Sequence, residues 1–247
     1  MSSVATATVR SYSSGAMKEP WNFYSCLTGR DATGYTETTV TPSGRGPIEV
    51  EAWSDDAPWA TSVRTALEED LPALIDVVGA DDAPVITTVH EDESSAVATD
   101  WFNPATGMLR LSEVVATRPD VTHRLARTLF DGLFTARWIT EGYAGWAEHE
   151  AGVSDAPCTA PATHPGSDEP FLARWVELSR TPTPDGLALE AWQRQASCHI
   201  VSTLADAIGP DAMRATVAMI RDGRSAYPAD AATAEVPVAV ALRKVRG

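Results

Sequence analysis

Two short strings in the middle of the chain hold side chains that could bind a metal ion or an anion. They are HRLAR at residues 123–127 and WITEGYAGW at residues 138–146. His123 offers an imidazole nitrogen and Glu141 a carboxylate, and both groups ligate zinc in proteins. Arg124 and Arg127 cannot ligate it, because a guanidinium stays protonated and has no lone pair to donate. Two candidate ligands and two fixed cations are therefore close in sequence.

The two strings together resemble the active-site segments of gluzincins, the thermolysin-like zinc metallopeptidases. The second string matches the pattern W-x-x-E-G-x-A-x-aromatic, whose Glu is the third zinc ligand, and the first takes the place of H-E-x-x-H. In that motif two His residues one turn apart hold zinc, and the Glu between them deprotonates the metal-bound water. Here Arg124 replaces the general base and Arg127 replaces the second His, with thirteen residues between Arg127 and Glu141.

The resemblance implies a catalytically impaired gluzincin that holds no zinc and acts as a binding or regulatory module. Candidates for a ligand-binding cleft are Arg124, Arg127, Trp101 and Tyr143, and the partner would be a peptide or an anionic small molecule. One alternative is an enzyme that uses the arginine-lined cleft for metal-free chemistry on an anionic ligand. Another is a zinc peptidase with atypical ligands.

No other residue near the strings completes a zinc site. Glu148 is two turns beyond Glu141, roughly 10 Å along a helix axis, and His149 is equally distant. The other histidines, His90, His164 and His199, are isolated in the sequence. We therefore expect the guanidinium of Arg127 to occupy the zinc position, in a two-pronged ion pair with Glu141.

The first string also has a plain structural interpretation. A helix from Pro119 to Thr135 would carry charged residues on one face and leucines on the other. Two pairs of opposite charge, Asp120 with Arg124 and Arg127 with Asp131, have the i,i+4 spacing of an ordinary solvated helix. In that case the protein would be an unrelated α/β protein.

Composition restricts the class of protein. The chain has 247 residues, of which 44% are hydrophobic, enough for a full core. A net charge of −15 disfavours binding to nucleic acid or to an anionic membrane. The three cysteines allow one disulfide at most. Neither a signal peptide nor an apolar run of membrane-spanning length is visible, so we expect a cytoplasmic protein.

The pattern of hydrophobic residues predicts an α+β protein, and the resemblance implies a zincin-like fold. A small N-terminal mixed sheet with helices would precede a mostly helical C-terminal lobe. The expected divisions are a poorly patterned segment over 1–46, an α/β lobe over 47–153, a helical lobe over 154–225 and a tail over 226–247. The expected strands are 48–53, 84–90, 96–102 and 108–111, and the expected helices are 57–78, 119–135, 138–151, 171–179, 187–208 and 210–222.

Overall fold

The protein is a mixed α+β structure made of two compact units. A computed structural model describes residues 8–10, 34–79, 83–92, 101–112, 115–134, 136–161 and 184–222. The first unit comprises Met1–Pro72 and Pro84–Arg124 and contains the sheet. The second comprises Ala73–Ala83 and Leu125–Gly247, and its described secondary-structure elements are helices. The α+β class predicted from the sequence is confirmed.

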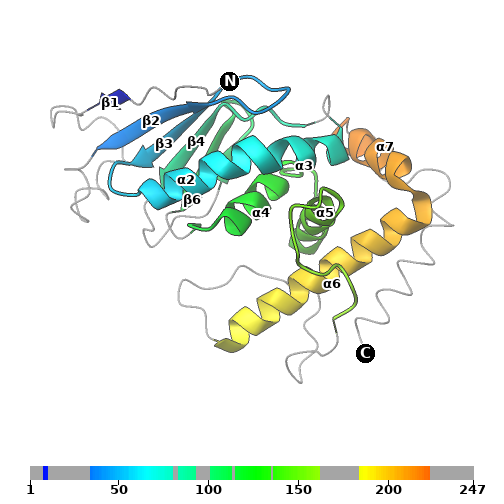
Figure 1. Ribbon diagram of the computed structural model, residues 1–247. Helices are drawn as coiled ribbons and strands as arrows, with labels where there is room; N and C mark the ends of the chain where they lie inside the picture. The colour runs from blue at the N-terminus through cyan, green and yellow to red at the C-terminus, as the bar shows by residue number, and fades with distance from the viewer. Residues whose placement is uncertain are drawn as a thin grey trace. The chain divides into compact units, whose positions relative to one another are not determined.

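The first unit is built on a six-stranded mixed sheet with the order β1-β2-β3-β4-β6-β5 (Figure 1). The β1-β2-β3 pairs are antiparallel, β4 is parallel to both β3 and β6, and β5 is antiparallel to β6. The strands are β1 (Thr8–Arg10), β2 (Tyr35–Val40), β3 (Ile48–Trp53), β4 (Thr88–Asp92), β5 (Trp101–Asn103) and β6 (Met108–Ser112).

The alternation of side chains along β3 gives the sheet two different faces. Ile48, Val50 and Ala52 are buried on one face, whereas Glu49 and Glu51 point to the other. Helix α2 (Ala57–Thr65) packs along β3 (Figure 1). The strand predicted at 48–53 is therefore confirmed, with its apolar face against a helix.

The helix predicted over 57–78 is confirmed in extent, but its middle turn is wider than an α-helix. After α2 comes a π-helical segment, η2 (Ala66–Asp70), and then α3 (Leu71–Val78). Asp56 begins the helix by accepting a hydrogen bond from the backbone N–H of Trp59 at 3.1 Å. Gly79, with φ at 103°, ends it, because this conformation is easy only for glycine.

Helix α4 (Arg118–Thr128) carries the HRLAR string and is shorter than the sequence predicts. It ends at Thr128 and not at Thr135. The N–H of Leu129 is shared between carbonyls three and four residues back, and that of Phe130 bonds to the carbonyl three residues back. Gly132 follows with φ at 69°, so the chain turns where the pattern of leucines suggested a further turn of helix.

The start of α4 is held by a buried acid in the first unit. Asp70 is 2% exposed and accepts hydrogen bonds from Arg118 Nε at 3.0 Å and Thr122 Oγ1 at 2.6 Å. A buried carboxylate needs such donors. Asp70 thereby fixes the face of α4 that points into the unit.

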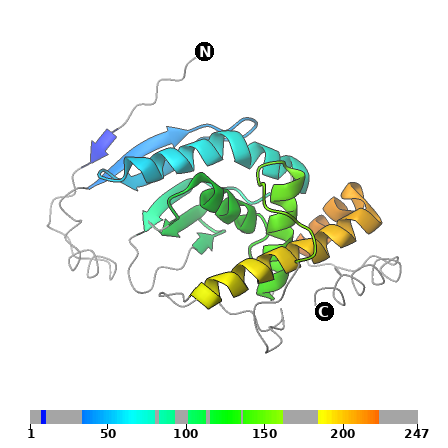
Figure 2. The same cartoon turned by 60° about the horizontal axis from the view of Figure 1, so that its bottom comes forward.

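In the second unit, α5 (Arg137–Glu150) crosses α6 (Pro184–Ile208), and α7 (Pro210–Arg221) follows (Figure 2). A Cβ on Gly142 would lie 2.8 Å from the backbone oxygen of Ser197, so this crossing requires glycine. A disulfide joins Cys158, in the loop after α5, to Cys198 on α6, with a Cα–Cα distance of 5.1 Å. These features tie α5 closely to α6.

Several predicted segments lie outside the described residues, among them the helix over 171–179, the tail over 226–247 and most of 1–46. In the described part of the chain, no helix is long and apolar enough to cross a membrane. The cytoplasmic location stays a prediction, and the Cys158–Cys198 disulfide is in tension with it, because disulfides persist mainly in oxidising compartments.

Candidate functional site

Glu141 is the centre of a buried ion cluster in the helical unit. It lies in the second turn of α5, and its side chain is 0% exposed. A buried carboxylate remains charged only when cations or hydrogen-bond donors surround it. Two guanidinium groups approach the same oxygen, Oε1, from different directions.

The first of these cations is Arg127, from the last turn of α4. Its Nε atom lies 3.2 Å from Glu141 Oε1, and its side chain is 24% exposed. The ion pair predicted from the sequence is therefore present, but the predicted two-pronged form is wrong. The closest approach is this single Nε–Oε1 distance, and among the described residues the Nε makes no well-aligned hydrogen bond.

The second cation is Arg137, the first residue of α5. Its Nε atom lies 3.4 Å from Glu141 Oε1, which is an i,i+4 contact along the helix. Arg137 thus turns one edge of its guanidinium toward Glu141 and leaves its two terminal nitrogens for another acid.

That other acid is Glu190 on α6. Arg137 Nη2 lies 2.6 Å from Glu190 Oε1, Nη1 lies 3.5 Å from Oε2, and Arg194 Nε approaches Oε1 at 3.3 Å. The Glu190 side chain is 8% exposed. Arginines and glutamates therefore alternate across α4, α5 and α6, and among the described residues three arginines face two glutamates in this cluster.

Sequence reasoning missed Arg137, Glu190 and Arg194. The spacing of Arg137 to Glu141 and of Glu190 to Arg194 is visible in the sequence as two i,i+4 pairs. The contact between the two pairs is not visible, because it depends on how closely α5 and α6 pack.

The remaining candidate residues have different surroundings. His123 and Arg124 are partly exposed and lie on the part of α4 that belongs to the first unit. Each of them interacts with another residue of the chain. Tyr143 is 5% exposed and packs against Phe134, with ring centroids 4.8 Å apart, so it belongs to an aromatic core. Trp101 is 51% exposed on β5.

A second polar cluster lies on the face of the sheet that points away from α2. His90, isolated in the sequence, has Nδ1 2.7 Å from Glu51 Oε2 and Nε2 3.4 Å from the hydroxyl of Tyr35. The hydrogen bond with His90 lowers the pKa of Glu51. Burial raises the pKa of Tyr35, with Asp92 adding to it, so its hydroxyl stays protonated.

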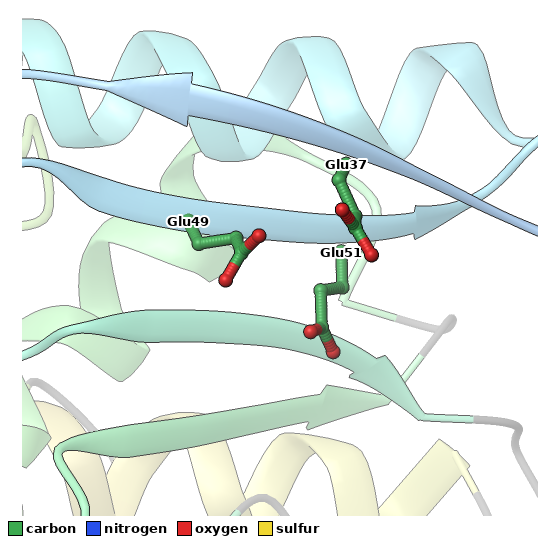
Figure 3. Close-up of side chains that lie close together, drawn as sticks. All are labelled: Glu37, Glu49 and Glu51. Atoms are coloured by element: carbon green, nitrogen blue, oxygen red, sulfur yellow. The ribbon is translucent and has the colours of Figure 1, made fainter. Parts of the chain in front are cut away.

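Three carboxylates gather beside this cluster. Glu37 projects from β2, and Glu49 and Glu51 project from β3, all toward one side of the sheet (Figure 3). One oxygen of each lies within 4.8 Å of the others. Such a set of oxygens suits a hard cation such as Ca²⁺ or Mg²⁺ better than zinc. Exposed acidic groups often gather in this way without a metal, so these three carboxylates do not by themselves define a site.

No family model, no curated protein and no solved structure matches the chain. The residues that bear on its function are therefore the two strings and the two polar clusters.

Proposed function

We propose that this chain is a gluzincin-like domain with a zincin-like fold, in which an arginine takes the position of the catalytic zinc. In this proposal it acts as a binding or regulatory module and catalyses no zinc-dependent hydrolysis. The observation that supports the proposal most is the pairing of Arg127 with Glu141, since these are the positions of a second and a third zinc ligand in the resemblance. The order of α4 and α5 along the chain is consistent with it.

The charges around Glu141 also favour the proposal. In an active zinc site, anionic or neutral ligands surround a divalent cation. Here Arg127 and Arg137 already supply two positive charges to one carboxylate oxygen. A zinc ion at that oxygen would meet both guanidinium groups at short range, and like charges in a buried setting repel strongly.

Elemental analysis of the purified protein tests the proposal directly. We expect no stoichiometric zinc and no chelator-sensitive peptidase activity. Near-equimolar zinc that a chelator removes together with proteolysis would contradict the proposal, and would favour a zinc peptidase with atypical ligands.

A restoration experiment tests the assignment of positions. We expect the double variant Arg124→Glu with Arg127→His to bind zinc through His123, the new imidazole and Glu141. The single variant Arg124→Glu is the control, and it should bind none. A folded double variant that takes up no zinc at micromolar concentrations would refute the gluzincin assignment. Hydrolysis should recover less than zinc binding. Loss of the outer groups that orient zinc ligands typically lowers metal affinity or activity about 10–100-fold.

The second candidate function is metal-free chemistry on an anionic ligand. It is favoured by the exposure of Arg127, whose side chain is 24% exposed and whose terminal nitrogens make no hydrogen bond among the described residues. A guanidinium fork suits a carboxylate or a phosphate. Turnover of an anionic metabolite that disappears in Arg127→Met would support this candidate over a pure binding module.

A further inference from the structure

A cavity of about 300 Å³ lies between α2 and the sheet, within the first unit. Val40, Val50 and Ala52, from β2 and β3, lie beneath it as an apolar floor and are each only 2% exposed. Helix α2 is anchored by Trp59 and Val63, both 0% exposed. Its flank of small side chains, among them Ala57 and Ala60, borders the cavity. The space exists because the residues on both sides are small.

One cation borders this cavity. Arg64, in the last turn of α2, is the only charged residue among the described residues that line it. Within the described ranges, Arg64 makes no ion pair and no hydrogen bond. The nearby acids of β2 and β3, Glu37, Glu49 and Glu51, point to the opposite face of the sheet because side chains alternate along a strand.

Hydroxyl groups complete the lining. Thr36 and Thr38, on β2, contribute two that have no hydrogen-bond partner among the described residues. The cavity therefore combines an apolar floor, two available hydroxyls and one unpaired guanidinium. A few convergent polar groups on an apolar wall are typical of a small-molecule site.

We propose that this cavity binds a short aliphatic carboxylic acid. The carboxylate would pair with the guanidinium of Arg64, and Thr36 and Thr38 would donate further hydrogen bonds. The alkyl chain would lie along Ala57 and Ala60, the more exposed apolar side chains of the lining. The volume is at the lower end of the roughly 300–1,000 Å³ of ligand pockets, so it suits a short chain and excludes a nucleotide or a folded peptide. The site is independent of Arg127 and Glu141.

Calorimetric titration with hexanoate tests the proposal, with hexylammonium and hexanol as matched probes of charge. We expect saturable binding of hexanoate with a Kd on the order of 1 mM, and much weaker binding of the other two. Arg64→Gln should weaken hexanoate about tenfold or more, because it removes the charge-assisted pair. Arg214→Gln, on α7 in the other unit, is the control and should bind as the wild type does.

A second variant tests the location of the site. Ala60→Leu should fill the cavity and abolish binding while circular dichroism shows a folded protein. If that variant fails to fold, Arg64→Gln decides, since its side chain is exposed and its loss leaves the core intact. The proposal is wrong if hexanoate does not saturate at tens of millimolar, or if Arg64→Gln binds it as tightly as the wild type.

Discussion

Removing the carboxylate of Glu141 should destabilise the helical unit strongly. In Glu141→Ala the guanidinium groups of Arg127 and Arg137 lose the acid that faces both of them. Breaking a buried ion pair by deleting one partner costs about 3–5 kcal/mol. The lower end applies here, because Arg137 keeps Glu190 as a partner and Arg127 is 24% exposed and can regain water. We therefore expect a loss of about 3 kcal/mol in the free energy of unfolding.

Urea denaturation followed by circular dichroism and tryptophan fluorescence measures this loss. With a slope of about 2–3 kcal/mol per molar urea, the midpoint should fall by about 1–1.5 M. Glu141→Gln, which keeps the shape and one acceptor oxygen, should lose less. Asp211→Ala is the matched control, because its contact with Arg214 is 3.8 Å long and solvent-exposed, so its midpoint should not move. An unchanged midpoint in Glu141→Ala would show that the cluster contributes nothing to stability.

Three further predictions concern the rest of the fold. Because its pKa is lowered in the folded state, Glu51 stabilises the protein above the ordinary glutamate value of 4.5, and this contribution is lost as pH falls through the lowered value. Glu51→Gln should therefore cost about 0.5–1 kcal/mol at neutral pH and show a smaller difference from wild type in acid, as urea titrations across pH can measure. Gly142→Ala should lower the midpoint, since overpacking costs about 1–3 kcal/mol against a helix-propensity gain of about 1 kcal/mol, whereas Gly46→Ala meets no atom within 4 Å and should be neutral. Thiol titration of the denatured, unreduced protein should find one thiol per chain and three after reduction; three before reduction would contradict the disulfide between Cys158 and Cys198.

The sequence by itself determined the local elements. The alternation at 48–53 predicts β3, and the helix over 57–78 follows from its apolar period and the stop at Gly79, because these signals depend only on neighbouring residues. The helices over 138–151, 187–208 and 210–222 were predicted within a few residues of α5, α6 and α7 for the same reason. Where a pattern of leucines continued past the true helix end, as after Thr128, the local signal misled.

Only one ion pair of the cluster, Arg127 with Glu141, was predicted from the sequence. That Arg127 should meet Glu141 followed from the resemblance, but the approach through Nε and the presence of a second cation, Arg137, did not. Arg137 and Glu190 are 53 residues apart, and their contact depends on the crossing of α5 and α6. That crossing depends in turn on residue 142 being a glycine, because a Cβ there would collide with the backbone of Ser197.

Tertiary structure alone decided which polar groups meet across the sheet. His90 and Glu51 are 39 residues apart and share a hydrogen bond because the parallel register of β3 and β4 sets them side by side. The alternation of side chains along β3 turns Glu51 away from the cavity that Arg64 borders. Periodicity in a sequence tells which residues share a face, whereas strand order and register, which result from packing of the whole chain, determine which residues of that face become neighbours.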